Sequence, residues 1–319
     1  MNLVEGVLAG DRLALSRLLT AVENDTPAGR AALDGLFPYT GQAYLIGITG
    51  SPGTGKSSLV NQLAKMFRQP PDDKPARRVA IVAVDPTSPF TGGAVLGDRV
   101  RMRDLSGDQG IFIRSMASRG ALGGLASHTA ALTQVFDAAG YEVILIETVG
   151  AGQAEVEIAS LAHTTLVVEA PGLGDDIQAI KAGILEIADI LVINKADHPG
   201  AENTRRALHA MLERSPAVGR ATGQTGEDWP VALETTVATS GEGIEALFAA
   251  IQRHYRYLHA SQEWQRRDLN RLRANLDDLI RDELVRRWRS GIADEAYQSA
   301  LARLTERRIS PYELLGELL

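Results

Sequence analysis

The sequence predicts a doubly wound α/β fold whose mostly parallel sheet carries helices on both faces, and three observations support this fold class. Short apolar runs rich in Val and Ile alternate with helical segments through the middle of the chain. Each run is almost continuously hydrophobic, which is typical of strands that are covered on both faces. Strands that alternate with helices imply right-handed crossovers, and such sheets bind ligands at the carboxyl ends of their strands. The expected strands cover residues 44–49, 79–84, 111–113, 143–146, 165–168, 190–193 and 231–233.

Three parts are expected along the chain. Residues 1–40 carry Leu and Val at helical spacing and predict an N-terminal helical extension. Residues 41–258 hold all of the expected strands, and residues 259–319 are expected to form a helical arm. The arm has an apolar stripe that either packs on the chain's own domain or forms a homodimer, and we favour the dimer because the stripe extends well past the sheet domain. Its members recur at intervals of three and four: Leu269, Leu272, Leu276, Leu279, Ile280, Leu284, Val285 and Trp288.

The composition is that of an ordinary globular protein. The chain has 319 residues, of which 45% are hydrophobic and 23% charged, and its formal net charge is −7. A negative charge disfavours a nonspecific nucleic-acid surface, which normally needs a basic excess. The absence of Cys excludes disulfides, thiolate metal sites and a cysteine nucleophile. No apolar run is long enough for a membrane span and the N-terminus does not resemble a signal peptide, so we expect a cytoplasmic protein without a membrane or nucleic-acid partner.

A phosphate-binding loop is the strongest signal in the sequence. The run Gly50-Ser51-Pro52-Gly53-Thr54-Gly55-Lys56-Ser57 satisfies G-x-x-x-x-G-K-[ST], and it lies between an expected strand and an expected helix over 57–67. Its glycines let several backbone N–H groups point at phosphate oxygens, and the helix N-terminus adds partial positive charge. We expect Lys56 to reach the β- and γ-phosphates and the Ser57 hydroxyl to coordinate Mg²⁺, and we include Ser58 among the nucleotide-binding residues.

Acidic residues that end two strands are candidates for the Mg²⁺ site. Asp85 follows the strand 79–84, and Glu147 follows the strand 143–146. Because Mg²⁺ prefers oxygen ligands, both carboxylates suit it. Asp85 could instead cap a turn before Pro86, whereas an acid that ends a buried strand, as Glu147 does, needs a partner. Three residues after Glu147, Gly150 can offer its backbone N–H to the γ-phosphate with no side chain in the way.

The run Asn194-Lys195-Ala196-Asp197 follows the strand 190–193 and predicts a guanine site. A carboxylate such as that of Asp197 can accept both the N1–H and the exocyclic amine of guanine, whereas adenine offers no such pair of donors. The Lys195 stem can pack over the base, and Asn194 can tie neighbouring loops together. Ala238, after the next strand, is a candidate backbone donor to the guanine oxygen. The sequence therefore predicts GTP or GDP as the bound nucleotide.

Several longer segments resemble the MeaB/ArgK family, which comprises G-protein chaperones of cobalamin-dependent acyl-CoA mutases and includes the methylmalonic aciduria type A protein. The resemblance covers nearly the whole chain, and the segment that begins at Asp85 is especially specific to the family. The matching segments are Gly47-Ile48-Thr49-Gly50, Asp85-Pro86-Thr87-Ser88-Pro89-Phe90-Thr91-Gly92-Gly93, Leu96-Gly97-Asp98-Arg99, Arg119-Gly120-Ala121-Leu122-Gly123-Gly124, Glu147-Thr148-Val149-Gly150-Ala151-Gly152-Gln153 and Asn194-Lys195-Ala196-Asp197.

The resemblance implies a homodimer that gates cobalamin delivery to a mutase and protects or rescues that enzyme, with GTP hydrolysis as the timer. It also implies that Asp85, Asp98 and Glu147 lie around Mg²⁺, and that the loop over 172–181 is a further switch whose Lys181 can approach the phosphates. No Gln directly follows Gly150, so we expect slow intrinsic hydrolysis that the partner accelerates by ordering the switch loops.

Other functions remain open at this point. A metallochaperone GTPase for metalloenzyme maturation would need His or Cys clusters, but the chain has no Cys and its six His residues form no tight cluster. An ATP-dependent kinase linked to basic amino-acid transport is disfavoured by the run 194–197, and a structural dimer with a vestigial site is disfavoured by the intact Lys56 and Ser57. The sequence does not decide among methylmalonyl-CoA, isobutyryl-CoA, ethylmalonyl-CoA and hydroxyisobutyryl-CoA mutases, although methylmalonyl-CoA mutase is the favoured partner.

Overall fold

The computed structural model describes residues 2–71, 74–86, 102–105, 107–118, 124–148, 153–172, 186–214 and 229–318. The side chains of Asp85 and Pro86 are outside this description, although both residues belong to a strand. Contacts divide the chain into two units, Met1–Asn275 and Leu276–Leu319. Among the helices that the structure describes, none is both long enough and apolar enough to cross a membrane.

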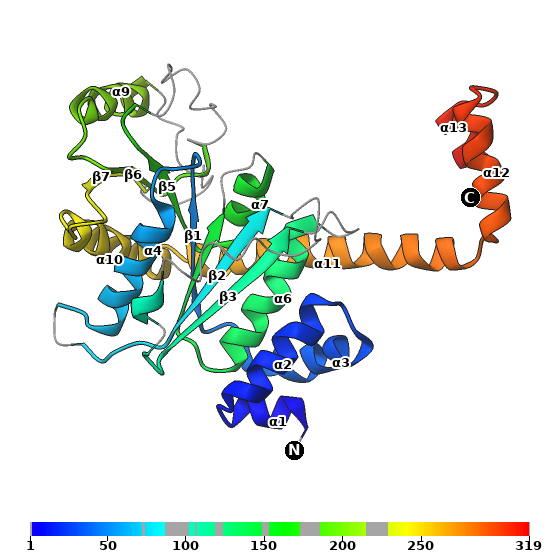
Figure 1. Cartoon of the computed structure of the whole chain (residues 1–319), viewed down its shortest axis with the longest axis horizontal. Helices are drawn as coiled ribbons and strands as arrows, with labels where there is room; N and C mark the ends of the chain where they lie inside the picture. The colour runs from blue at the N-terminus through cyan, green and yellow to red at the C-terminus, as the bar shows by residue number, and fades with distance from the viewer. Residues whose placement is uncertain are drawn as a thin grey trace. The chain divides into compact units, whose positions relative to one another are not determined.

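The first unit is built on a seven-stranded sheet in which every pairing of neighbouring strands is parallel (Figure 1). The order is β3-β2-β4-β1-β5-β6-β7, which confirms the predicted α/β fold. Because β1 lies between β4 and β5, the segment that leaves its carboxyl end runs between two neighbouring strand ends. The strands are β1 (Tyr44–Thr49), β2 (Val79–Pro86), β3 (Ile111–Ser118), β4 (Val143–Thr148), β5 (Thr164–Glu169), β6 (Ile190–Asn194) and β7 (Ala232–Thr236).

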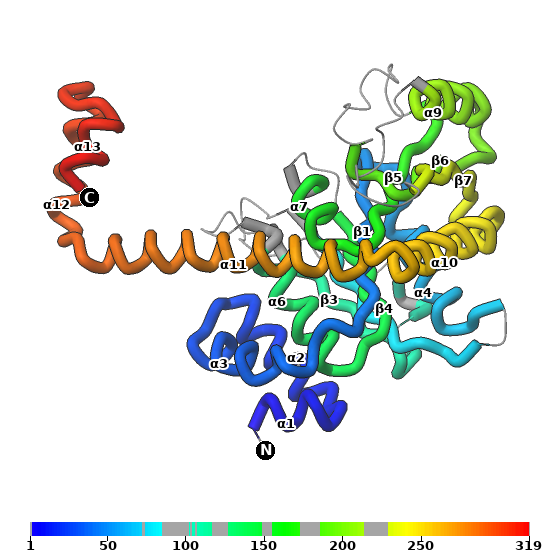
Figure 2. Tube along the Cα trace, turned by 180° about the vertical axis from the view of Figure 1, so that it is seen from behind, coloured from blue at the N-terminus to red at the C-terminus, as the bar shows by residue number. Residues whose placement is uncertain are grey.

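Helices cover both faces of the sheet (Figures 1 and 2). α4 (Lys56–Arg68) and α10 (Ile244–Ala260) share one core with Ile46 and Ile48 of β1. α6 (Gly124–Ala138) and α7 (Gln153–Leu161) share a second core with Leu45 of the same strand, and α9 (Ala201–Arg214) packs on β6. Since successive side chains of a strand point to opposite faces, a strand covered on both sides must be apolar at every position. This is why the predicted runs were continuous rather than alternating.

The N-terminal residues form three helices that extend the second core. They are α1 (Leu3–Leu8), α2 (Arg12–Glu23) and α3 (Pro27–Leu36), followed by the short helix η1 (Phe37–Tyr39). Side chains of Asn2, Asp11 and Thr26 cap the three helices, and each accepts a backbone N–H of the first turn. Buried leucines of α2 belong to the same hydrophobic core as Val135 and Phe136 of α6. The expected helical extension is therefore present and adds a layer outside α6.

Helix α11 (Glu263–Ser290) is the long helix predicted from the apolar spacing, and it belongs to both units. In the first unit, its beginning is held by the buried side chains of Trp264 and Arg267. The second unit contains the end of α11 with α12 (Asp294–Thr305) and α13 (Pro311–Leu318), and the Trp288 indole N–H donates to the Leu318 carbonyl at 2.8 Å. Six of the stripe residues of α11 are exposed, with 60% exposure for Leu269 and 61% for Leu284, whereas Val285 and Trp288 are partly buried.

Candidate nucleotide site

The predicted phosphate loop leaves β1 at a position that only glycine can occupy. Gly50 has φ +132°, and a Cβ atom added there would lie 2.1 Å from the Val168 carbonyl oxygen on β5. Gly55 has φ +89°, and its added Cβ would lie 2.4 Å from Asn194 Nδ2. These two glycines let the loop pass directly beside β5 and beside the end of β6. The following helix α4 has no side-chain cap, so the N–H groups of its first turn are suited to an anionic ligand.

Lys56 is held in a curled conformation by the loop itself. Its Nζ donates to the Gly50 carbonyl at 2.8 Å and to the Ser51 carbonyl at 2.9 Å, and the side chain is buried. The Thr54 hydroxyl closes the loop by donating to the Ser51 carbonyl at 3.0 Å. The ammonium group is therefore fixed inside the turn rather than extended into solvent. At the tip of the loop, Pro52 and Gly53 are exposed.

Ser57 and Glu147 meet although they come from different elements. The Ser57 hydroxyl, in the first turn of α4, donates to Glu147 Oε1 near the end of β4 at 2.6 Å, and both residues are buried. A hydroxyl and a carboxylate at this spacing are oxygen ligands of the kind that Mg²⁺ takes, so these two residues fit that ion. Asp85 is the penultimate residue of the neighbouring strand β2, whose Ala83 is in register with Glu147. Its side chain is not described, and Asp98, Gly150 and Lys181 lie outside the described residues.

Asn194 connects the phosphate loop with the predicted base-reading loop. Its Nδ2 donates to the Thr54 carbonyl at 2.7 Å, while its Oδ1 accepts the Ala238 N–H at 3.0 Å and the Thr236 hydroxyl at 3.1 Å. Lys195 follows in the left-handed region with φ +58°, and Asp197 is exposed on the next turn. The three loops therefore meet at one end of the sheet, as expected from their positions after β1, β6 and β7.

The Ala238 backbone has two hydrogen-bond partners among the described residues. Its N–H donates to Asn194, and its carbonyl accepts from Gln62 Nε2 on α4 at 2.8 Å. If this N–H also reads the guanine oxygen, as the sequence predicts, it must be shared between two acceptors or transferred from Asn194 to the base. Gln62 was not singled out by the sequence, because a single Gln on an amphipathic helix carries no pattern of its own.

Glu169, like Gln62, is a residue of this site that the sequence did not indicate. It ends β5 beside the phosphate loop, is buried, and is hydrogen-bonded to the Ser51 hydroxyl. Burial raises the pKa of this carboxyl to about 7, and the nearby Glu155 carboxylate adds to the rise. The Lys56 ammonium and the Ser51 hydrogen bond oppose it. The signal that could have found Glu169 is the one that indicated Glu147, namely an acid that ends a buried strand.

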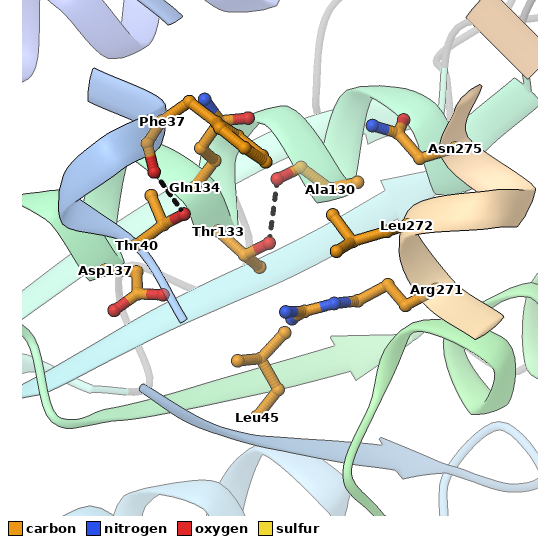
Figure 3. Close-up of a pocket in the computed structure, with 10 residues that line it drawn as sticks. All are labelled: Phe37, Thr40, Leu45, Ala130, Thr133, Gln134, Asp137, Arg271, Leu272 and Asn275. Atoms are coloured by element: carbon orange, nitrogen blue, oxygen red, sulfur yellow. Dashed lines mark hydrogen bonds between the residues drawn. The ribbon is translucent and has the colours of Figure 1, made fainter. Parts of the chain in front are cut away.

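A pocket at the other end of β1 is not part of this site (Figure 3). Leu45, near the start of β1, lies at its floor, whereas the phosphate loop follows the carboxyl end of the same strand. The Asp137 carboxylate in this pocket accepts three backbone N–H groups, from residues 41, 42 and 43. The remaining lining residues are Phe37, Thr40, Ala130, Thr133, Gln134, Arg271, Leu272 and Asn275.

Within the described part of the chain, no group of three or more His, Cys, Asp or Glu residues is arranged to hold a metal ion. The arrangement does bring together an uncapped helix N-terminus, an ammonium, a hydroxyl–carboxylate pair and the base-reading loop. These are the groups that bind a nucleoside polyphosphate and order it for phosphoryl transfer.

Comparison with known proteins gives results that cover nearly the whole chain. The sequence profile of the family described as methylmalonyl Co-A mutase-associated GTPase MeaB matches residues 15–293. A protein of Pyrococcus abyssi named as a GTPase is 42% identical over 318 residues, which are 100% of this chain and 95% of that protein. The GTPase ArgK of Escherichia coli is 33% identical over 317 residues, which are 97% of this chain and 92% of ArgK.

A solved structure shares the fold. The crystal structure of a protein titled LAO/AO transport system kinase superposes with a TM-score of 0.70 at 27% sequence identity. The match covers 99% of this chain and 95% of that one, so the similarity includes the helical segments at both ends.

Proposed function

The chain belongs to the MeaB family of methylmalonyl Co-A mutase-associated GTPases, and from that premise we propose that it is a GTP-hydrolysing chaperone of a cobalamin-dependent acyl-CoA mutase. In this role it gates the loading of the cobalamin cofactor and protects or reactivates the mutase. The partner we propose is methylmalonyl-CoA mutase, the enzyme that the description of the family names. A cytoplasmic location remains a prediction from the sequence.

The observation that carries the nucleotide part of the proposal is the position of Asn194. One amide side chain bonds the phosphate loop through Thr54 and the base loop through Ala238. The phosphate cradle and the base-reading Asp197 are thus parts of a single proposed site. A GTPase needs this arrangement because the same nucleotide must be selected by its base and positioned by its phosphates.

Each residue of the phosphate site has a proposed role. The N–H groups of the loop and of Ser58 hold phosphate oxygens, and Lys56 contacts the β- and γ-phosphates from its fixed position. Ser57, Asp85, Asp98 and Glu147 are the proposed Mg²⁺ ligands, directly or through water. When bound, this ion neutralises charge on the phosphate oxygens. The proposed roles of Gly150 and Lys181 are contacts to the γ-phosphate.

The base loop has three proposed contacts. Asp197 accepts the two donors of guanine, the stem of Lys195 covers the base, and the Ala238 N–H donates to the guanine oxygen. The exposed position of Asp197 supports its role, because a carboxylate without a ligand is solvated and becomes covered only when the base binds.

The proposed homodimer uses the apolar stripe of α11. Leu276, Leu279 and Leu284 of this stripe are 56%, 51% and 61% exposed, although side chains of this type gain about 1.5–3 kcal/mol each on full burial. The neighbouring charged residues of α11 already form ion pairs along the helix, as Arg287 does with Glu283 at 2.6 Å. The apolar face is thus the part of the helix that a second copy can cover.

The deciding experiment compares the hydrolysis of GTP and ATP in the presence of Mg²⁺, with and without methylmalonyl-CoA mutase. We expect slow turnover that is selective for GTP and rises when the mutase is added. Isobutyryl-CoA mutase is the matched control partner. Turnover that is selective for GTP but ignores both mutases contradicts the chaperone role and leaves the GTPase in place. A preference for ATP contradicts the proposed base site.

A further inference from the structure

A buried carboxylate next to the phosphate loop has no assigned role. Glu169 is only 8% exposed at the end of β5, and β5 pairs directly with β1, with Val167 in register with Thr49. The loop that leaves β1 passes so close to β5 that Gly50 leaves no room for a Cβ beside Val168. Glu169 is thus the next residue along β5, beside the turn that receives the phosphates.

Among the residues that the structure describes, three groups from different elements interact with the Glu169 carboxylate. The Ser51 hydroxyl from the loop is hydrogen-bonded to it, and the Lys56 ammonium from the start of α4 attracts it. The Glu155 carboxylate from the first turn of α7 repels it, and Glu155 is itself only 6% exposed. Because the charged side chains of Glu169, Lys56 and Glu155 are all buried, solvent screens their interactions only weakly. A change of charge in the loop is therefore felt by Glu169.

A bound nucleotide brings several negative charges into this cradle, next to the Ser51 and Lys56 groups that face Glu169. A like charge nearby disfavours the ionised form of a carboxyl group. We propose that Glu169 takes up a proton when a guanosine diphosphate or triphosphate binds to the loop over 50–57, and so sets the net charge of the phosphate cradle. This inference rests on the proposed nucleotide binding.

The proposal fixes the direction in which affinity depends on pH. In the free protein, burial and Glu155 raise the pKa of Glu169 to about 7. The phosphates raise this pKa further, so the protonated form binds nucleotide more tightly than the ionised form. Affinity therefore changes little below the free pKa, falls as the pH rises through it, and levels off above the bound pKa. Loss of one coupled proton corresponds to a fall of up to about tenfold per pH unit in that window.

Titration calorimetry of GDP with Mg²⁺ tests the proposal without any variant. At pH 7.5 the apparent binding enthalpy is measured in two buffers with different ionisation enthalpies, and the difference gives the number of protons exchanged. We expect the wild-type protein to take up roughly half a proton, and its Kd to rise about tenfold from pH 6.5 to pH 8.5. Proton release, or no exchange at pH 7.5, overturns the inference.

The variant Glu169→Gln distinguishes protons that this carboxyl takes up from protons that the phosphates of the nucleotide exchange, since those phosphates also titrate in this range. The variant should lose the uptake and hold its Kd within about twofold over the same pH range. Glu245→Gln, which removes an exposed carboxylate from the first turn of α10, is the matched control and should behave as wild type. Equal uptake in Glu169→Gln and wild type overturns the assignment to Glu169.

One further variant tests the proposed cluster, and GDP binding to the wild-type protein separates a failure of the nucleotide site from a failure of the proton-uptake proposal. Glu155→Gln removes the repelling neighbour, so the fall in affinity should begin at lower pH, and an unchanged pH profile contradicts the proposed cluster. The pH profile of Glu155→Gln still tests the proposal if Glu169→Gln does not fold, and thermal unfolding shows whether Glu169→Gln is folded. If GDP does not bind to wild type at any pH, the proposed nucleotide site itself fails, which differs from binding without proton uptake.

Discussion

Arg267 and Asp189 form a bidentate ion pair at the amino ends of β5 and β6, with Nη1 and Nη2 of the arginine each 2.9 Å from one carboxylate oxygen. Asp189 directly precedes β6, and its Oδ2 also accepts the Thr165 N–H of β5 at 2.8 Å. Arg267 also donates to the His163 carbonyl. The start of α11 is thus bonded to the amino ends of β5 and β6, the strands whose other ends carry Glu169 and Asn194. Both partners of the pair are buried, with exposures of 7% and 2%.

Replacing Arg267 by Met should strongly destabilise the first unit. Removing one partner of a buried pair leaves the Asp189 carboxylate without its guanidinium partner, which costs about 3–5 kcal/mol. Urea denaturation followed by circular dichroism measures the change in the free energy of unfolding. The double variant Arg267→Met with Asp189→Asn should recover part of the loss, because the amide is neutral and still accepts the Thr165 N–H. A single variant as stable as wild type contradicts this role.

The free energy of unfolding should fall as the pH drops from neutral to acid, because His163 must then become protonated. The His163 Nδ1 accepts the Leu45 N–H at 3.1 Å and Nε2 lies 3.0 Å from Asp268, so the ring fits its site in the neutral form. Burial lowers the pKa of this histidine to about 4, below its unfolded value. Its stabilising contribution is therefore complete above about pH 6.5 and is lost as the pH falls toward 4, by about 2 kcal/mol between pH 7 and pH 5.

The check is urea denaturation of wild type and His163→Asn at both pH values. The variant should be less stable than wild type at pH 7. Because it lacks the titrating ring, its free energy of unfolding should fall less between pH 7 and pH 5 than that of wild type. Equal losses in the two proteins would assign the acid sensitivity to other groups.

Asp197→Asn should exchange the base preference of the proposed site. The two adjacent donors of guanine then face one acceptor and one donor, which should weaken GTP binding by about 100-fold or more. Xanthosine triphosphate carries an acceptor in place of the exocyclic amine and should gain affinity. Competition against a fluorescent guanine nucleotide measures both changes. Glu202→Gln on the exposed face of α9 is the control, and an unchanged GTP affinity of Asp197→Asn would exclude Asp197 from base reading.

Leu279→Glu combined with Leu284→Glu should convert the proposed dimer into a monomer. Two charges on an apolar stripe cannot be covered by a second copy without desolvation, which is costly unless each charge is paired. Size-exclusion chromatography with light scattering gives the mass, and Arg273→Glu on the same helix is the control. Intrinsic GTP hydrolysis should not change, because neither leucine is a residue of the proposed nucleotide site. A dimer that survives both substitutions would place the interface elsewhere.

The predicted strands were found at their expected places, and the largest boundary differences are at the two edges of the sheet. β3 was predicted over 111–113 but extends to Ser118, and β7 was predicted over 231–233 but extends to Thr236. Both are edge strands. Arg114 of β3 is only partly buried and pairs with Glu23 of α2. A polar residue interrupts the hydrophobic pattern without interrupting the backbone ladder, so edge strands appear shorter in the sequence than they are.

The phosphate site was largely predictable because its motif is continuous. The eight residues over 50–57 must be consecutive to make a turn that leads from a strand into a helix, so the sequence identifies them directly. The base loop over 194–197 was recognised for the same reason. The roles of Asp98 and Lys181 were implied by the family resemblance, and that of Gly150 by its position after Glu147, but all three residues lie outside the described residues and their roles stay proposals.

By itself, the sequence determined the α/β class, the strands, the phosphate loop and the resemblance to the family, since each depends on residues close together in the chain. Only the tertiary structure decided which distant groups meet. Ser57 meets Glu147 because β4 lies beside β1, and Glu169 faces Lys56 because β5 lies on its other side. Hydrophobic runs of similar composition can pair in many orders, so the contacts across a sheet depend on a strand order that no single segment encodes.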